Sequence, residues 1–148
     1  MYDTLLPSSL RIGVLRGGPS SEYDVSLQSG AHVLKHLSET HKPVDIFISR
    51  DGAWHVGGVE KSPERILKHM DVVFNALHGT FGEDSKVQDL LNSHDIPYTG
   101  SDKLPSAIAM NKWLTKERLK LVGIKTPVAV LIRADDSLDQ KHVSLNGD

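Results

Sequence analysis

The 148-residue chain contains no cysteine. This absence excludes disulfide bonds, thiolate metal ligands and a cysteine nucleophile, and it is consistent with a reducing compartment. No apolar run approaches the ~20 residues that a membrane-spanning helix needs. The first ten residues also lack the basic and apolar segments of a signal peptide. We therefore expect a cytoplasmic protein that makes no contact with a membrane.

The chain also has little net charge, formally −2 at pH 7. Such a balance provides no electrostatic attraction to nucleic acid or to an anionic membrane surface. Apolar residues make up 39% of the chain and charged residues 24%, which is typical of a soluble globular protein. The length is enough for one domain with a real core, or for one domain and part of a second.

Apolar residues recur in a pattern that alternates between strands and helices. Long strands are predicted at residues 10–15, 44–48 and 72–77, and helices at residues 26–37, 63–70, 84–93 and 104–122. The run at 72–77 is apolar on both faces, which is typical of a buried strand in a parallel sheet. This order predicts an α/β fold with an open, mostly parallel, doubly wound sheet.

Shorter segments complete the predicted organisation. Residues 53–56 follow the turn signal Asp51-Gly52 and can pair back as a hairpin strand. Residues 96–100 indicate a short strand or an extended stretch, and residues 126–132 a last strand. Gly123 is a candidate C-cap for the helix before it. We therefore expect one α/β domain at residues 1–123 and the start of an incomplete second domain at residues 124–148.

Two loops follow predicted strands at the edge where open α/β sheets bind ligands. In the first, Gly17 and Gly18 precede Glu22 and Asp24. A carboxylate there can hold a ligand ammonium, or it can cap the next helix or face solvent. In the second, His78 leads into Gly79 and Gly82. Its ring can donate to a carboxylate or phosphate, or shuttle protons, or simply bond the backbone of a tight turn.

Other candidates are weaker when taken alone. Lys112 lies in a charged helical face and, by itself, indicates a solvated surface residue. His32 and His36 share a helix face, but no third ligand completes a zinc set, so we expect no metal site. The first loop matches neither the dinucleotide fingerprint nor the P-loop pattern.

Several motifs taken together resemble the N-terminal part of D-alanine–D-alanine ligases, which belong to the ATP-grasp superfamily. The resemblance extends from about residue 10 to residue 132. It rests on the segments at residues 17–26, 78–84 with Gln88, 96–101, 106–112 with residues 115–116, and 123–127. It implies a Rossmann-like pre-ATP-grasp domain.

The family joins two D-alanines with ATP and Mg²⁺ through D-alanyl phosphate, a step in peptidoglycan precursor synthesis. The resemblance implies that Glu22 and His78 are catalytic. Glu22 orients the ammonium of the first D-alanine, and His78 lies near its carboxyl group and the phosphate it acquires. Val25 lines the same site, and Lys112 reaches the nucleotide phosphates. The resemblance also implies a homodimer formed through this domain.

The chain departs from the family pattern at three positions and in length. Asn111 stands where the family has aspartate, and Ser85 and Asp89 stand where it has glycines. We expect Ser85 and Asp89 to suit local helix propensity. The family's nucleotide cleft and magnesium ligands lie beyond residue 148, so we expect this chain alone to be inactive. The alternatives are a non-catalytic module that binds a small molecule or partner, and a domain of another ATP-grasp carboxylate–amine ligase. Glu22 and His78 argue against the latter.

Overall fold

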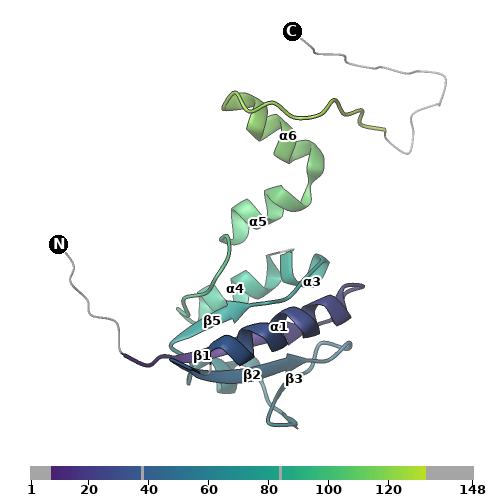
Figure 1. Ribbon diagram of the computed structural model, residues 1–148. Coiled ribbons are helices and arrows are strands. Elements are labelled where there is room, and N and C mark those ends of the chain that lie inside the picture. Colours follow the sequence, from purple (N-terminus) through teal and green to yellow (C-terminus); the bar gives the residue numbers. More distant parts are fainter. Residues whose placement is uncertain (1–7, 38, 84, 133–148) are drawn as a thin grey trace. The chain divides into compact units, whose positions relative to one another are not determined.

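A computed structural model describes residues 8–37, 39–83 and 85–132 of the chain. The chain divides into two compact units, Met1–Ala107 and Ile108–Asp148. The domain boundary predicted near Gly123 remains a prediction. The elements, labelled in Figure 1, are β1 Arg11–Gly17, α1 Tyr23–Leu37, β2 Lys42–Ile48, β3 Trp54–Val56, β4 Val59–Glu60, α2 Pro63–Leu67, β5 Val72–Asn75, α3 Thr80–Glu83, α4 Lys86–Ser93, α5 Lys103–Met110 and α6 Lys112–Leu121.

The first unit is built on one five-stranded sheet with the strand order β4-β3-β2-β1-β5. Its three longer strands are parallel: Leu15 of β1 pairs with Ile46 of β2 and with Asn75 of β5. The short strands β3 and β4 add an antiparallel edge, which confirms the predicted hairpin. In the stretch at residues 96–100, Tyr98 forms an isolated parallel bridge to Val73 of β5, so the stretch adds one bridge and no full strand to the sheet.

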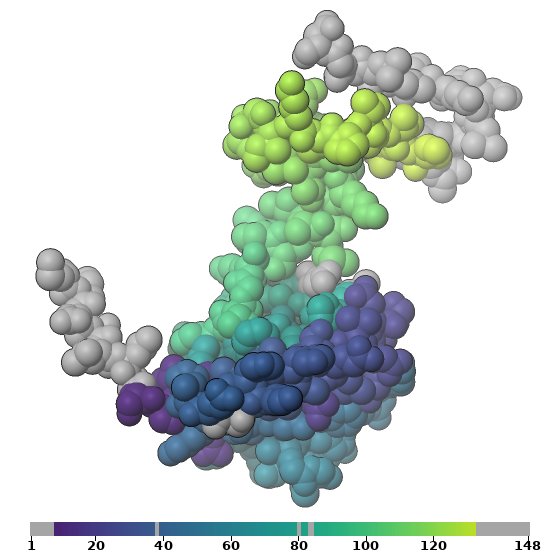
Figure 2. Space-filling model, viewed as in Figure 1, coloured from purple at the N-terminus to yellow at the C-terminus, as the bar shows by residue number. Residues whose placement is uncertain are grey.

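The order of the strands explains why helices cover both faces. The connection through α1 runs from β1 to β2, whereas the connection through α2 returns past β1 to β5. Right-handed crossovers in opposite directions place their helices on opposite faces of a sheet. Figure 1 shows α1 lying along β1 and β2, and its side chains form part of the surface visible in Figure 2. The predicted open, doubly wound α/β sheet is confirmed, with an antiparallel edge.

The main hydrophobic core lies between the sheet and the helices α2 and α4. Leu15 and Ile46 from the sheet are fully buried in this core, as are Leu67 of α2 and Leu91 of α4. The contribution of α1 differs, because its buried positions, Ser26 and Gly30, are small. The face of α1 that meets the sheet is therefore partly polar, and its small side chains let the helix lie close to the strands. This matters at the edge of the sheet where the two loops meet.

The predicted single helix at residues 104–122 is wrong, because the structure has two helices, α5 and α6, that meet at Asn111. The Asn111 side chain accepts hydrogen bonds from the backbone N–H groups of Trp113 and Leu114, both at 3.1 Å. An asparagine in extended conformation that accepts these bonds is an N-cap. Its capping bonds start a new helix where periodicity alone predicted continuation.

The predicted last strand at residues 126–132 is also wrong. These residues form neither a helix nor a strand in the structure. The Pro127 carbonyl instead accepts a hydrogen bond of 2.5 Å from Lys116 Nζ. A strand is stabilised by pairing with a neighbour, and no described residue provides one for this segment. Its apolar side chains Val128 and Ile132 are exposed.

The helix predicted from Asp84 begins later, as α4 at Lys86, and the short helix α3 precedes it. Asp84 itself lies outside the described residues. Ser85 adopts φ +79°, a left-handed conformation that favours glycine. The expectation that Ser85 suits helix propensity is therefore wrong, because Ser85 occupies a turn just before the helix.

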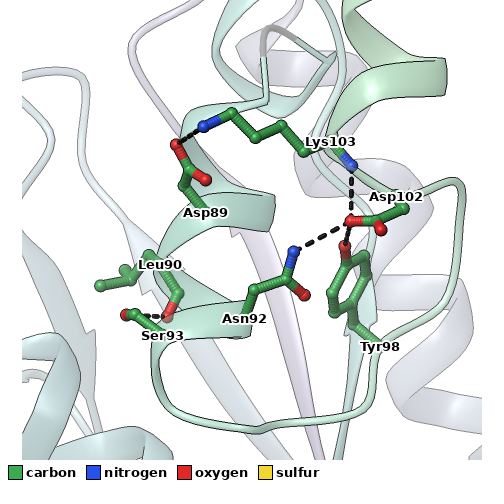
Figure 3. A network of polar contacts seen from close by, with 7 residues as sticks. All are labelled: Asp89, Leu90, Asn92, Ser93, Tyr98, Asp102 and Lys103. Atoms are coloured by element: carbon green, nitrogen blue, oxygen red, sulfur yellow. Dashed lines mark hydrogen bonds and ion pairs between the residues drawn. The ribbon is translucent and has the colours of Figure 1, made fainter.

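Polar contacts attach α4 to the start of α5 within the first unit (Figure 3). Asp102 Oδ1 accepts hydrogen bonds from Asn92 at 2.9 Å, from the Lys103 N–H at 2.7 Å and from the Tyr98 hydroxyl at 3.1 Å. These bonds, with that from Asn92 the largest cause, lower the pKa of Asp102. Lys103 Nζ lies 2.5 Å from Asp89 Oδ2, so Asp89 forms an ion pair in this network.

Candidate functional site at the carboxyl edge of β1 and β5

The loops after β1 and β5 lie side by side because their strands are neighbours and parallel. From β1, the chain crosses through α1 to β2 on one side, while β5 lies on the other side. Such a reversal of strand order opens a crevice at the carboxyl ends of the strands, where α/β proteins bind ligands. The structure thus brings together the two loops that sequence reasoning selected separately.

Ser26, in the first turns of α1, is a buried connection between the two strand ends. Its side chain has 0% exposure. Its hydroxyl accepts a hydrogen bond from the Gly17 N–H at 2.8 Å and donates one to the Ala76 carbonyl at 2.8 Å. A single hydroxyl therefore bonds one backbone group at each strand end, and it holds α1 against both strands.

Two more serines extend this connection to His78. Ser20 Oγ donates to the His78 carbonyl at 2.8 Å and accepts from the Glu22 N–H at 2.9 Å. Ser29 Oγ lies 3.0 Å from His78 Nε2. We call Ser20, Ser26 and Ser29 the serine clamp, because each hydroxyl binds the segment from Ala76 to His78.

Two glycines permit the close approach of the loops. Gly79 has φ +71°, and a Cβ atom there would lie 3.0 Å from Ser20 Oγ and 3.5 Å from Glu22 Oε1. Gly18 has φ +89°, and a Cβ atom would lie 2.9 Å from a ring carbon of Phe81. Both positions combine a left-handed backbone with little free space, so larger side chains would push the loops apart.

Glu22 lies at the start of α1, where its carbonyl accepts the Ser26 N–H at 2.9 Å. Its side chain is exposed, and its carboxylate makes no hydrogen bond with a described residue. The carboxylate lies near Gly79 of the second loop and is open to a ligand. Asp24, by contrast, pairs with Arg50, with 3.5 Å between Nη2 and Oδ2, and Arg50 stacks on the Tyr23 ring.

The other predicted site residues, Val25 and Lys112, are exposed. Val25 lies in the first turn of α1 and is 50% exposed. Lys112 is the first residue of α6, belongs to the second unit and is exposed. The roles predicted for Val25 and Lys112, like those for Glu22 and His78, remain predictions.

A second set of polar contacts, made by side chains of β5 and α4, holds the backbone of the loop after β5. Gln88 Nε2 donates to the Gly82 carbonyl at 3.0 Å, and Asn75 Nδ2 donates to the same oxygen at 3.3 Å. Asn75 Oδ1 also accepts the Leu77 N–H at 3.2 Å. Gln88 is buried in α4. The sequence motif included Gln88, but only the structure shows that it holds the loop backbone.

The charged groups around the strand ends are not equally available. Arg16 of β1 forms two hydrogen bonds with Asp45 of β2, at 2.7 Å and 2.6 Å. These bonds raise the pKa of Arg16, and the Asp45 carboxylate balances the positive charge of the Arg16 guanidinium. The carboxylate of Glu22, which makes no hydrogen bond with a described residue, and the ring of His78 are therefore the candidate groups of this edge for the two charges of a zwitterionic ligand.

The described residues provide no group of three His, Asp or Glu side chains that could hold a metal ion. The rings of His32 and His36 bond to the carbonyls four residues earlier, at 2.9 Å and 2.8 Å. A small cavity of about 70 Å³, lined by residues that include Arg11 and Met70, lies at the opposite edge of the sheet. None of the predicted site residues lines it.

Comparison with known proteins identifies the family of the chain that carries these two loops. The sequence model of the family described as "D-ala D-ala ligase N-terminus" matches residues 11–66 and 57–101. The chain belongs to this family. The matched residues include Glu22, His78 and the whole serine clamp, so both loops lie within the match to the D-ala D-ala ligase N-terminus.

Individual relatives agree with the family match. The chain is 39% identical over 139 residues to a D-alanine--D-alanine ligase of Clostridium botulinum (strain 657 / Type Ba4), covering 93% of this chain and 43% of that protein. It resembles the D-alanine--D-alanine ligase of Bacillus anthracis complexed with ATP, with TM-score 0.71 and 33% identity, covering 90% of this chain and 43% of that one. It also resembles the VanG D-Ala:D-Ser ligase of Enterococcus faecalis, with TM-score 0.70 and 31% identity, over 80% of this chain and 43% of that one. The chain thus spans about two fifths of the length of these relatives.

No helix in the described part of the chain is both long enough and apolar enough to cross a membrane.

Proposed function

We propose that this chain is the N-terminal portion of a D-alanine–D-alanine ligase and that its two-loop edge binds the first D-alanine. In the complete reaction, ATP and two D-alanines yield D-alanyl-D-alanine, ADP and phosphate through D-alanyl phosphate. The observation that carries the proposal is the placement of the open Glu22 carboxylate beside the loop of His78, with the serine clamp joining them. Its relatives, named D-alanine--D-alanine ligases, support the same conclusion.

The chemistry of the two groups fits the two ends of an amino acid. The Glu22 carboxylate binds the ammonium of the first D-alanine through a charge-assisted hydrogen bond. The His78 ring donates to the D-alanine carboxylate and to the phosphoryl group that it receives. Phosphoryl transfer to a carboxylate depends mainly on positioning and on neutralising charge, and both groups serve those ends. Val25 lines the same site in this proposal.

The nucleotide enters the proposal through Lys112, which we assign to the phosphates of ATP. An ammonium is suited to this role as a compact positive charge. One structural relative, the Bacillus anthracis ligase, was solved with ATP. The described residues provide no group of three His, Asp or Glu side chains that could hold the Mg²⁺ that the family implies, so we assign no residue of this chain to that ion. We derive no step through it.

We further assign the protein to the ATP-grasp superfamily and to the synthesis of peptidoglycan precursors in the cytoplasm, where it would act as a homodimer. D-Alanine ligases provide a dipeptide for cell-wall precursors, and this assignment depends on the proposed reaction.

Binding of D-alanine to the ¹⁵N-labelled chain tests the proposal. We expect D-alanine, but not L-alanine, to shift backbone signals at residues 17–25 and 76–82. The Glu22→Gln variant removes the charge that faces the ammonium, so it should weaken binding at least about tenfold, the scale of one charged hydrogen bond. Glu39→Gln, at an exposed position after α1, is the matched control and should bind like the unmodified chain.

Two outcomes would count against the assignment. An absence of shifts with D-alanine at saturating concentrations would favour a non-catalytic module that has kept the fold. Equal weakening by Glu22→Gln and Glu39→Gln would show that Glu22 acts only through net charge.

A further inference from the structure

Ser29 contacts the ring of His78 but is not one of the predicted site residues. The residues of the two loops do not by themselves indicate what this contact does. Ser29 lies three residues after Ser26, so the two serines share the face of α1 that meets the sheet. Ser29 is half-buried, and its Oγ lies 3.0 Å from His78 Nε2. This contact joins a helix side chain to the ring of a proposed substrate-binding residue.

The partners of the two side chains decide the direction of this hydrogen bond. A serine hydroxyl has one proton to donate, and serines within helices often donate it to the carbonyl four residues earlier. Within the described part of the chain, Ser29 Oγ makes no such bond, and its contact is with His78 Nε2. The Ser29 hydroxyl therefore has an acceptor when Nε2 is unprotonated.

His78 Nδ1 makes no hydrogen bond with any residue that the structure describes. A neutral imidazole carries its proton on one nitrogen, and the hydrogen bond made by the other nitrogen decides which. If Nε2 accepts from Ser29, the proton lies on Nδ1. The ring then has a donor left for a ligand.

We propose that Ser29 is a positioning residue that holds His78 with its proton on Nδ1, so that Nδ1–H donates to an oxygen of the first D-alanine carboxylate or of its phosphate. The proposal rests on the assignment of His78 to the D-alanine site. A preorganised donor of this kind stabilises negative charge without reorganising when the charge develops. Without Ser29, the ring would be free to exchange its proton between both nitrogens and to rotate.

The other two residues of the serine clamp, Ser20 and Ser26, hold the backbone on both sides of the contact between Ser29 and His78. Ser26 fixes α1 to the Ala76 carbonyl, two residues before His78, and Ser20 fixes the His78 carbonyl. The backbone on both sides of the Ser29–His78 contact is therefore restrained. A side chain whose surroundings are restrained in this way loses little further freedom when it orients its partner.

The ¹⁵N chemical shifts of the imidazole nitrogens measure the position of the proton directly. In the ¹⁵N-labelled chain with neutral histidines, we expect His78 to show a protonated Nδ1 and an unprotonated Nε2. The spectrum of His78→Gln identifies which of the eight histidine signals belongs to this ring. Ser29→Ala should shift the proton towards Nε2, and Ser29→Thr, which keeps the hydroxyl, should restore the original pattern.

Ser21→Ala is the matched control, because Ser21 is exposed and its hydroxyl makes no hydrogen bond with a described residue. It should leave the His78 shifts unchanged. A protonated Nε2 in the unmodified chain would overturn the proposal, as would Ser29→Ala with an unchanged ring pattern. Both results concern the ring alone and do not depend on D-alanine.

Titration with D-alanine separates this proposal from the proposed function. If D-alanine binds, Ser29→Ala should weaken binding about threefold to tenfold, the range of one lost hydrogen bond, and Ser29→Thr should recover it. Binding of D-alanine with the proton on Nε2 would refute the role of Ser29 and leave the function intact. The expected ring pattern without any binding of D-alanine would refute the function, and with it the part of the proposal that concerns the ligand.

Discussion

The substitution Ser26→Ala removes the hydroxyl that connects the ends of β1 and β5. Ser26 is fully buried and its hydroxyl serves two backbone groups, the Gly17 N–H and the Ala76 carbonyl, each at 2.8 Å. The methyl group of alanine would leave both groups buried without a partner. An unsatisfied buried polar group costs about 1–3 kcal/mol. Partial relaxation of α1 would recover some of this loss, so we expect a destabilisation of about 2–4 kcal/mol.

This loss is large beside the ~5–15 kcal/mol by which natural domains are stable. Urea unfolding of the chain, followed by circular dichroism, measures it as a lower midpoint with an unchanged slope. Ser21→Ala, at an exposed serine of the same loop, is the control and should stay within about 0.5 kcal/mol of the unmodified chain. A loss for Ser26→Ala no larger than that of the control would refute the idea that Ser26 joins the two strand ends.

Three further changes test other features of the first unit. Ser85→Gly should raise stability by about 1 kcal/mol, because Ser85 has φ +79° and a left-handed backbone costs a non-glycine residue that order of energy; an unchanged or lower melting temperature would contradict this. Gly79→Ala should lower stability by about 1 kcal/mol or more, since it adds a Cβ 3.0 Å from Ser20 Oγ at φ +71°. The same change should weaken D-alanine binding. An unchanged affinity in calorimetric titration would argue against the close approach of the two loops. The hydrogen bonds that lower the pKa of Asp102 below its ordinary value stabilise the fold at neutral pH, and this stabilisation is lost as pH falls through the lowered pKa. The difference in unfolding free energy between the unmodified chain and Asp102→Asn should therefore shrink in acid, and a difference that is constant with pH would exclude the carboxylate as its source.

Several features of the fold could be predicted because they depend on local pattern. The apolar run at residues 72–77, which becomes β5, indicates burial on both faces, and together with the alternation of strands and helices it predicted a parallel sheet covered by helices. Because loops that follow parallel strands collect at one edge, Glu22 and His78 could be selected as candidate site residues from their positions in the chain. The family match then agreed with both loops.

Other features depended on competition between local and distant contacts. Periodicity predicted one helix through Asn111, but the asparagine side chain caps the backbone of the following residues and starts a second helix. Residues 126–132 have the composition of a strand, yet a strand requires a partner, and the described residues provide none. Ser85 looked suited to a helix, whereas its backbone has the left-handed conformation of a turn.

The sequence by itself determined the three long strands that become β1, β2 and β5, the helices between them, the two loops and the chemical character of Glu22 and His78, because these follow from residue type and spacing. The tertiary structure decided which groups of those loops meet. Ser20, Ser26 and Ser29 look like ordinary loop and helix serines until the sheet places the Ala76–His78 segment beside them. Hydrogen bonds between residues 49 to 58 positions apart have no signature in local sequence, and they exist only because β1 and β5 are neighbours.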